Sequence, residues 1–572
     1  MTSDAGDRPP VVSRVPTPES APVRTVSDLL VERLLQTGTR RLFGLPGGGT
    51  SLDLIESARV RGMEFVLARH ECAAVMMAAT AADLEGSVGL ALTTKGPGLA
   101  NAVNGIAHAA LDRSALALVA DGFSDKQRSY VTHQWFDQRA VLAPLVSAHS
   151  TLAPAASAPA EIDRLIGAAL APRRGPVHIE LNGSDARELV AASSLAGGSS
   201  DRPSPVTNES GALPSATVDR GRELLRQARR PVLVLGLEAR RPAVVERIRR
   251  LAETLGCAVL VTYKGKGIVS DESPLYAGIF TGGAAEQATV ASADLIVLIG
   301  ADPVEFILQP WPYQLPVLEL GLYRHPVHYL RAEVELHGSL EASLDALTEA
   351  ARPSDWTTGE ISKHRERMRH DLAYRGSGQG IDPQQLVTHT LEVCAIHRNA
   401  LGQLPRVSVD AGAHMFSATT FWPCHAAQDL LISNGLATMG YALPAAIAAA
   451  LHERDRPAIA FTGDGGLMMC LAELATAVEQ RLRCIVIVFN DGALSLIDIK
   501  QQSRQLPAAG VRWDRPDFAQ VMQGLGGLGL RADSPTALRK AVEQALATDG
   551  PVLIDAAVDP SGYPAQLRAL RG

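Results

Sequence analysis

Residues 457–493 constrain the fold of this chain more than any other stretch. A short apolar strand, expected at Ala458 to Thr462, runs into the glycine-flanked carboxylate Asp464. A stretch rich in Ala, Leu and Glu follows with helical spacing, and a second apolar strand, expected at Ile485 to Phe489, leads into an Asn-Asp pair that ends at Asp491. Strand, helix and parallel strand form a βαβ unit, whose crossover brings both strand-ending turns to one edge of the sheet. We therefore expect Asp464 and Asp491 to face one another.

Two carboxylates across a short gap suit a hard divalent cation that holds a phosphate. Mg²⁺ prefers oxygen ligands, commonly one or two carboxylates together with substrate phosphates and water. Gly463, Gly465 and Gly466 surround Asp464 and allow the backbone to approach a phosphate closely. The alternative is that this Gly-Asp-Gly-Gly run is only a turn between a strand and a helix. The Asn-Asp pair at the end of the next strand favours the metal site.

The composition bounds the class of protein. The 572 residues carry a formal net charge of −7 and show no basic stripe with interleaved aromatic residues, so we expect no nucleic-acid partner. No apolar run reaches the length of a membrane span, and we expect no membrane partner. The six cysteines are scattered without metal-type spacing, which predicts reduced thiols in a cytoplasmic protein. Residues 1–23 lack a hydrophobic signal core and are expected to form a disordered leader.

Two stretches of linker-like composition divide the chain into three blocks. Residues 191–216 are rich in Ser, Gly and Pro, and residues 351–382 combine charge, Pro and Gly with a weak apolar pattern. Within each block strands alternate with helices, which predicts an α/β protein with three doubly wound parallel-sheet domains. The expected domains are residues 24–190, 217–350 and 383–560, followed by a tail at residues 561–572.

Glu71 is the candidate for proton transfer in the first block. It follows a strand expected at Met63 to Ala68 and begins an otherwise apolar helix, so its carboxyl group should be buried. Burial favours the protonated form of a carboxyl group and suits it to exchange protons near neutrality. The alternative is an ordinary acidic residue that interacts with the dipole at a helix N-terminus.

The motifs of the first and last blocks together resemble a known family. Gly-Asp-Gly-Gly followed by Asn-Asp, and the order Pro-Gly-Gly, Arg-His-Glu, Gly-Pro-Gly-x-x-Asn, resemble thiamine-diphosphate (ThDP) enzymes of the acetolactate synthase and pyruvate decarboxylase superfamily. The resemblance covers nearly the whole chain beyond Val23. It implies an N-terminal domain that binds the pyrimidine ring of ThDP, a central domain, and a C-terminal domain that binds the diphosphate.

The resemblance also implies roles for single residues. Asp464, Asp491 and the Ala493 carbonyl would bind Mg²⁺, although many relatives have Asn in place of Asp491. Glu71 would bond the aminopyrimidine ring and promote removal of the C2 proton, while the chemistry itself belongs to the cofactor. The other expected site residues are Gly47, Gly48, His133 and Gln134 near the reacting carbon, and Asp410, Gly412, His414, Met439, Gly463, Gly465, Gly466 and Asn490 around the cofactor.

Three of these positions have a plainer alternative or depart from the family. Met439, expected to hold ThDP in its bent conformation, has core filling as its alternative. Lys95 stands where relatives have a small residue, and no role follows for it from the sequence. Lys500 takes the place of a Trp that selects the acceptor in acetolactate synthases, which points to a different acceptor and admits a charged one.

The central block resembles the domain that binds FAD in acetolactate synthases, ADP in some relatives and nothing in others. A Gly-x-Gly-x-x-Gly fingerprint is missing after its first strand, expected at Pro231 to Leu235. The run from Ala301 to Val304 replaces a segment that contains Arg in acetolactate synthases. FAD is therefore doubtful, and a purely structural domain is the alternative.

The resemblance implies a ThDP- and Mg²⁺-dependent transferase or lyase that decarboxylates a 2-oxo acid and transfers the acyl carbanion to an acceptor, as an acetolactate synthase-like carboligase does. The alternatives are a simple 2-oxo acid decarboxylase and, from the Thr132-His133-Gln134 motif, a non-decarboxylating transferase like N2-(2-carboxyethyl)arginine synthase. A non-enzymatic regulatory subunit would lack Glu71 or a metal ligand, and a nicotinamide dehydrogenase would need the missing glycine fingerprint. In this family the site lies between two subunits, so small-molecule substrates and a homodimer or homotetramer are expected.

Overall fold

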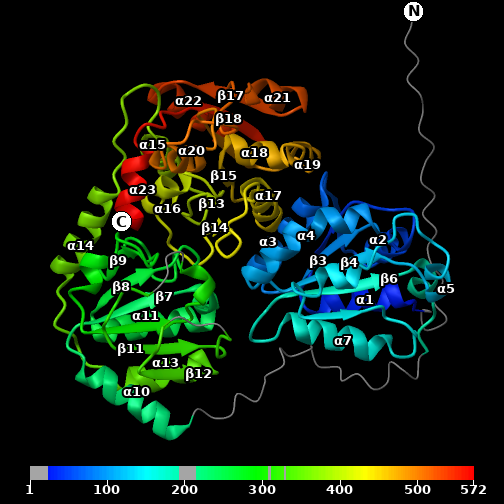
Figure 1. Cartoon of the computed structure of the whole chain (residues 1–572), viewed down its shortest axis with the longest axis horizontal. Coiled ribbons are helices and arrows are strands. Elements are labelled where there is room, and N and C mark those ends of the chain that lie inside the picture. The colour runs from blue at the N-terminus through cyan, green and yellow to red at the C-terminus, as the bar shows by residue number, and fades with distance from the viewer. Residues whose placement is uncertain (1–23, 192–213, 307–310, 327–329) are drawn as a thin grey trace, which may run out of the picture.

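Three six-stranded sheets, each flanked by helices, form three lobes of the chain (Figure 1). The structure is a computed structural model and describes residues 24–191, 214–306, 311–326 and 330–572. Every strand pairing within the three sheets is parallel. The predicted α/β class with three parallel-sheet domains is thus confirmed. The expected leader and most of the first expected linker lie outside the described residues.

The first sheet has the strand order β2-β1-β3-β4-β6-β5. Its strands are β1 (Arg41–Gly44), β2 (Glu64–Leu67), β3 (Gly89–Thr93), β4 (Leu116–Asp121), β5 (Ala148–Ser150) and β6 (Pro176–Leu181). Its helices are α1 (Val26–Gln36), α2 (Thr50–Val60), α3 (Glu71–Glu85), α4 (Pro97–Leu111), α5 (Asp125–Arg128), α6 (Gln138–Leu142), α7 (Ala158–Ala169) and α8 (Gly183–Ala186). Chain reversals after β1, β3 and β4 therefore all lie at one edge of this sheet.

The second sheet has the order β12-β11-β10-β7-β8-β9. Its strands are β7 (Pro231–Leu235), β8 (Ala258–Val261), β9 (Tyr276–Ile279), β10 (Leu295–Ile299), β11 (Val317–Gly321) and β12 (Val334–His337). Its helices are α10 (Ser215–Gln227), α11 (Pro242–Leu255), α12 (Gln287–Val290) and α13 (Leu340–Ala350), with short 3₁₀ turns η1 (Leu237–Arg240) and η2 (Pro303–Glu305). The strand order reverses between β10 and β7, which is where ligands bind in open sheets of this kind.

The third sheet has the order β14-β13-β15-β16-β18-β17. Its strands are β13 (Arg406–Val409), β14 (Leu430–Ile432), β15 (Ala458–Gly463), β16 (Cys484–Asn490), β17 (Leu528–Ala532) and β18 (Val552–Ala557). Its helices are α15 (Pro383–Ile396), α16 (His414–Phe421), α17 (Ala442–His452), α18 (Asp464–Cys470), α19 (Glu473–Glu479), α20 (Ser495–Ser503), α21 (Phe518–Gly524) and α22 (Pro535–Ala547). All seven residues of β16 are buried, as its continuous apolar run predicts for an inner parallel strand.

Helix α3 joins the first and third lobes by packing against both α4 and α17, and Figure 1 shows these helices at the junction. Small side chains make this close packing possible, because α3 and α17 are largely alanine and are buried over most of their length. On α4, a methyl group at Gly105 would lie 2.7 Å from Val75 Cβ and 2.8 Å from the Cys72 carbonyl oxygen. Glu71, at the start of α3, is therefore held by a rigid inter-domain contact.

The segments expected to be the second linker and the tail each contain a packed helix. Residues 351–382 contain helix α14 (Thr358–Asp371), and its Met368 packs against β9, where a methyl group at Gly278 would lie 2.4 Å from the sulfur. The expected tail forms α23 (Tyr563–Arg571), whose Gln566 is buried and donates to the Leu372 carbonyl at 2.8 Å. Each helix packs against the domains through a few widely spaced buried side chains. These are too few to produce an evident apolar pattern in the sequence.

In the part of the chain that the structure describes, no helix combines the length and the apolar character that crossing a membrane requires.

Candidate active site

The turn after β15 carries the first predicted metal ligand. Helix α18 begins at Asp464 itself, and the helix expected at Leu471 to Arg481 corresponds to α19. Asp464 is buried, and each carboxylate oxygen accepts one backbone N–H at 2.8 Å, from Gly465 and from Gly492. These bonds fix the carboxylate while each oxygen keeps a lone pair for another ligand.

The turn after β16 brings the second carboxylate to the same pocket. Asp491 and Ala493 line a cavity of about 210 Å³ together with Asp464. The Ser495 hydroxyl donates to the Asp491 carboxylate at 2.5 Å. Burial, reinforced by the nearby charge of Asp464, raises the pKa of Asp491 to about 7. Two carboxylates that repel one another beside a backbone carbonyl form the oxygen-rich donor set that Mg²⁺ prefers, so the residues present fit this ion.

Glycines in the wall of this pocket leave space that larger side chains would fill. A methyl group at Gly465 would lie 2.9 Å from Leu494 Cδ2 and 3.4 Å from Met439 Cε. His414 also lines the pocket, and its Nε2 is buried without a hydrogen-bond partner among the described residues. Burial lowers the pKa of His414 to about 4, so the imidazole is neutral and can bond a polar ligand. Gly412, Gly463 and Gly466 complete the expected lining. A phosphorylated cofactor therefore fits this cradle.

Met439 reaches the pocket because its segment takes unusual backbone conformations. Ala437 has φ +52° and Gly440 has φ +79°, both in the left-handed region. Such conformations persist where the surroundings enforce them. Met439 is half-buried in the pocket wall rather than part of the domain core, so ordinary core filling does not describe its position.

Asp410 and Asn490 differ from their expected role at the cofactor, because neither side chain lines the pocket. The Asp410 carboxylate is fully buried and accepts the N–H groups of Gly440 at 3.1 Å and Tyr441 at 3.2 Å. It also accepts the Thr462 hydroxyl at 2.9 Å. Asn490 donates to Asp555 and to the Pro516 carbonyl. Both are positioning residues: Asp410 holds the Met439 segment, and Asn490 holds the end of β16.

The first domain presents Glu71 at the carboxyl edge of its sheet. Glu71 is buried, and its Oε2 accepts the side-chain amide of Asn101 at 3.1 Å. A methyl group at Gly98 would lie 3.2 Å from Oε1, so that glycine keeps this oxygen accessible. The preceding His70 is exposed and caps α3, its Nδ1 accepting the Cys72 N–H. His70 is thus the capping residue, and Glu71 lies in the first turn of α3.

Sequence reasoning missed the two residues that fix the Gly47-Gly48 turn. The Gly47 N–H donates to Ser51 Oγ at 2.9 Å, and Ser51 donates through its N–H and hydroxyl to the Asp121 carboxylate. A methyl group at Gly47 would lie 2.8 Å from Asp121 Oδ2, so glycine is required there. Asp121 ends β4, and only the strand order brings it beside the turn after β1. Its position at the end of an apolar strand was the one available signal.

His133 and Gln134 are both exposed and line none of the cavities near the metal-binding turns. Gln134 has φ +57° and packs on the loop before α4, where a methyl group at Gly96 would lie 2.6 Å from the Gln134 carbonyl oxygen. Lys500 lies on the exposed side of α20 and likewise lines neither cavity. Within one chain, these three side chains and Glu71 are not brought to the glycine-lined pocket.

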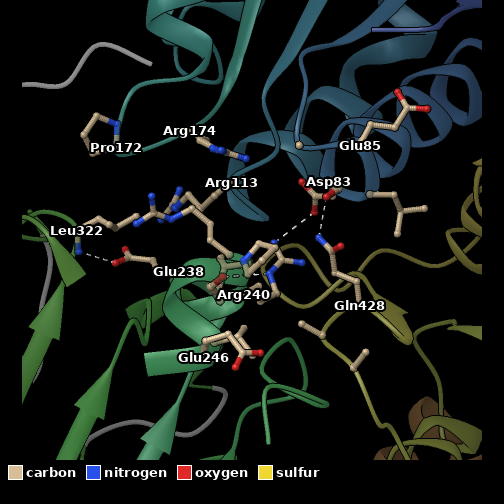
Figure 2. A pocket seen from close by; sticks show the side chains of 18 of the residues that line it. Asp83, Glu85, Arg113, Pro172, Arg174, Glu238, Arg240, Glu246, Leu322 and Gln428 are labelled. Atoms are coloured by element: carbon tan, nitrogen blue, oxygen red, sulfur yellow. Dashed lines mark hydrogen bonds and ion pairs between the residues drawn. The ribbon is translucent and has the colours of Figure 1, made fainter. Parts of the chain in front are cut away.

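A cavity of about 590 Å³ lies where the three domains meet. Figure 2 shows side chains from all of them converging on it, with Asp83, Arg113 and Arg174 from the first domain, Arg240 from the second and Gln428 from the third. Arg113 bonds Asp302 at 2.6 Å, Arg240 pairs with Asp83 at 3.3 Å, and Gln428 donates to the Asp83 carbonyl at 2.7 Å. These bonds fix the three domains relative to one another.

The carboxyl edge of the central sheet, where FAD is doubtful from the sequence, carries buried acidic groups. The crevice between β7 and β10 is where a dinucleotide diphosphate would bind in such a sheet. Three buried carboxyl groups occupy this edge, those of Glu238, Asp302 and Glu305. Burial raises the pKa of Glu305 to about 7, and the group accepts the N–H of Leu237.

Comparison with known families finds the same family in all three domains. The N-terminal TPP binding domain of thiamine pyrophosphate enzymes matches residues 24–141. The central domain of these enzymes matches residues 218–347, and their C-terminal TPP binding domain matches residues 410–556. Thiamine pyrophosphate is another name for ThDP.

Comparison with individual proteins finds relatives along almost the whole chain. An acetolactate synthase of Bacillus subtilis is 25% identical over 94% of this chain and 93% of its own length. A catabolic acetolactate synthase of Raoultella terrigena is 28% identical over 93% of this chain and 95% of its own. A probable 2-ketoarginine decarboxylase of Pseudomonas aeruginosa is 29% identical over 88% of each chain. With all three domains matched in order, the chain belongs to the thiamine pyrophosphate enzymes, as an acetolactate synthase-like member of that family.

Proposed function

We propose that this ThDP-dependent enzyme requires Mg²⁺, decarboxylates a 2-oxo acid and transfers the remaining acyl unit to an acceptor. The observation that carries this proposal is the convergence of Asp464, Asp491 and Ala493 on one glycine-lined pocket. The two carboxylates and the Ala493 carbonyl would hold Mg²⁺, and the backbone of Gly465 and Gly466 would lie against the diphosphate. When bound, ThDP supplies the carbon nucleophile and the electron sink for the carbon–carbon cleavage.

Glu71 moves the proton in this proposal. Its Oε2 is engaged by Asn101, so Oε1 is the atom that would hold a proton and exchange it with the pyrimidine ring. Burial beside Gly98 keeps bulk water from competing for that atom. Met439 would pack against the cofactor, since it lines the pocket beside Gly465.

A second copy of the chain completes the site in this proposal, as a homodimer or a homotetramer. Glu71 lines no part of the pocket that holds Asp464, so one copy would supply Glu71 and its partner the metal-binding turns. Two large apolar side chains, Met468 at 53% and Met469 at 61% exposure, follow directly after the Gly-Asp-Gly-Gly turn. Exposed apolar surface beside a site is typical of a subunit interface.

The proposed setting of the enzyme follows from its cysteines and its central domain. All six cysteines are unpaired, which supports a reducing, cytoplasmic compartment. The acidic carboxyl edge of the central sheet supports catalysis without FAD, with that domain acting as a structural spacer. The domains are proposed at the limits expected from the sequence, with α14 and α23 added as packed elements.

Two other reactions would use the same cofactor and the same site residues. The name of the Pseudomonas aeruginosa relative favours a simple 2-oxo acid decarboxylase, in which the acyl unit leaves as an aldehyde after protonation. The Thr132-His133-Gln134 motif favours a non-decarboxylating transferase like N2-(2-carboxyethyl)arginine synthase. The three reactions differ in whether CO₂ is released and in whether a new carbon–carbon bond forms.

The test is an assay with ThDP, Mg²⁺ and a panel of 2-oxo acids, with and without aldehyde and oxo-acid acceptors. The proposal expects CO₂ together with a ligated product. An aldehyde as sole organic product would establish the decarboxylase, and product formation without CO₂ would establish the third reaction.

Glu71→Gln should lower turnover by about 100-fold or more while ThDP still binds. The control is Glu56→Gln, a surface residue paired with Arg59, which should leave turnover unchanged. Turnover of Glu71→Gln at the unmutated rate would reject the role of Glu71.

A further inference from the structure

Lys95 places a positive charge without a direct ion pair at the carboxyl edge of the first domain's sheet. It lies in the loop between β3 and α4 and is half-buried. Its Nζ sits 5.1 Å from the centre of the Phe123 ring, a cation–π contact. Among the described residues, no carboxylate lies within ion-pair distance of Nζ, and no hydrogen bond engages it. The Asp121 carboxylate acts on this charge from beyond ion-pair distance, so the half-buried ammonium group still lacks a hydrogen-bond partner that a ligand could supply.

The charge faces a cavity of about 410 Å³. The turn at Gly49 and Thr50 forms one wall, the end of β4 with Phe123 forms another, and the loop after β6 with Asn182 closes the third side. Most of this lining is polar, unlike the pocket that holds Met439. A polar cavity with one free cation suits a small charged group better than an apolar chain.

The remaining polar groups of the cavity favour an anion. Asp121, the buried carboxylate in the wall, already accepts the N–H and hydroxyl of Ser51. Burial raises the pKa of Asp121, and the charge of Lys95 acts against that shift. Gln127 accepts the N–H and hydroxyl of Ser124 through its carbonyl oxygen, which leaves its amide N–H groups without a partner in the described structure. Lys95 and Gln127 thus offer donors to a ligand, while the Asp121 oxygens are bonded to Ser51.

The cavity adjoins every residue that the first domain contributes to the proposed reaction. Gly49 belongs to the same turn as Gly47 and Gly48, which Asp121 holds in place. Gly96, next to Lys95, contacts Gln134, and Gly98 lies against Glu71. All of these positions follow strands at the carboxyl edge of the sheet, where open α/β sheets bind ligands. The cavity with Lys95 therefore lies on the same sheet edge as the turn at Gly47 and the loop next to Glu71.

We propose that Lys95 is a specificity-determining residue that binds an anionic group, a carboxylate or a phosphate, carried by the substrate away from its reacting carbonyl. The inference rests on the proposed function and names the substrate class for it. The alternative is that Lys95 only packs on the Phe123 ring. In that case KM and affinity would not depend on the charge of the substrate's distal group.

The test compares substrates that differ in their distal group, using the full chain with ThDP and Mg²⁺. Pyruvate has no second anionic group, 2-oxoglutarate carries a distal carboxylate, and glyceraldehyde 3-phosphate carries a phosphate. Lys95→Met keeps most of the apolar stem against Phe123 and removes the charge, so the fold should persist. We expect it to raise KM for the preferred anionic substrate by roughly tenfold or more, with little change for pyruvate. Lys95→Arg should restore most of that preference.

Lys126→Met is the matched control, because this lysine is exposed on the adjacent helix α5 and does not line the cavity. It should leave unchanged the ratio of KM for the substrates with a distal anionic group to KM for pyruvate. The same KM ratio in Lys95→Met and in the unmutated enzyme would overturn the proposal. Calorimetric binding of 2-oxoglutarate and glyceraldehyde 3-phosphate provides a readout that needs no turnover. Equal affinity for both ligands in the unmutated and Lys95→Met proteins would also overturn it. Absence of ThDP uptake would instead reject the proposed function, so the two failures are distinguishable.

Discussion

The backbone N–H of Gly492 donates to Oδ2 of Asp464 at 2.8 Å, and this bond ties the turn after β16 to the turn after β15. The two turns lie next to each other because β15 and β16 are paired in parallel from Ala458 to Gly463. Asp491 is therefore placed against Asp464 by the backbone before any ion binds. A preformed pair of ligands lowers the ordering cost of binding a cation.

The first prediction separates the two carboxylates of this pair. Asp464→Ala removes a ligand that the backbone holds rigidly, and should weaken Mg²⁺-dependent ThDP binding by about 100-fold or more, since even the loss of an outer partner of a metal ligand can cost that much. Asp491→Asn keeps an oxygen ligand and relieves the repulsion from Asp464, so binding should stay within about tenfold of the unmutated value. Calorimetry measures both. Asp549→Asn is the control, because Asp549 is exposed and distant in sequence from both carboxylates. Equal losses of ThDP affinity in Asp464→Ala and Asp491→Asn would contradict this prediction.

The second prediction concerns the space beside Gly465. A methyl group there would lie 2.9 Å from Leu494 Cδ2 and would enter the volume meant for the cofactor. Gly465→Ala should therefore lower ThDP affinity strongly while the thermal midpoint changes little. Gly524→Ala, in the same domain and with open space around the added group, should change neither quantity. Unaltered ThDP affinity in Gly465→Ala would show that the cofactor lies elsewhere.

The sequence predicted those parts of the site that local pattern encodes. The continuous apolar run of β16 and the glycines around Asp464 specify a βαβ unit within a short stretch, and the structure contains it. Ser51 and Asp121 could not be found this way, because their contact depends on β4 lying two strands from β1 in a sheet whose order no local spacing reveals. Helix α14 was missed because its buried residues, Ile361 and Met368, are separated by charged ones.

The third prediction tests the support of the Gly47 turn. Ser51→Ala removes the hydroxyl that accepts the Gly47 N–H and donates to Asp121, leaving buried polar groups unsatisfied at a cost of about 1–3 kcal/mol. We expect a lower thermal midpoint together with a fall in kcat that exceeds any change in KM for ThDP. Ser27→Ala is the matched control, since the Ser27 hydroxyl is equally buried in the same domain but has no partner in the described structure. A kcat equal to that of the control would argue against a role for this turn in catalysis.

The fourth prediction concerns the buried ion pair between Asp112 and Lys264, 2.7 Å apart, which joins the first and central domains. Burial opposes the charged form, but Lys264 and the Gly435 N–H hold the pKa of Asp112 below its ordinary value of 3.8. The stability that this carboxylate contributes is therefore complete above that value and is lost as the pH falls below it.

Lys264→Met should destabilise the protein by about 3–5 kcal/mol, because it leaves the Asp112 charge buried without its partner. Adding Asp112→Asn should recover a large part of this loss, since the amide oxygen still accepts the Gly435 N–H. Scanning calorimetry at neutral pH measures Lys264→Met, Asp112→Asn and the double variant. Strictly additive losses in the double variant would show that the two side chains do not act as a pair.

The most direct measurement is a calorimetric titration of ThDP into the purified full-length protein, with Mg²⁺ present and again after its removal by a chelator. If Asp464, Asp491 and Ala493 hold the ion that binds the diphosphate, ThDP should bind saturably at one site per chain with Mg²⁺ and lose most of its affinity without it. No uptake of ThDP in the presence of Mg²⁺, or uptake of equal affinity after chelation, would contradict the proposed site.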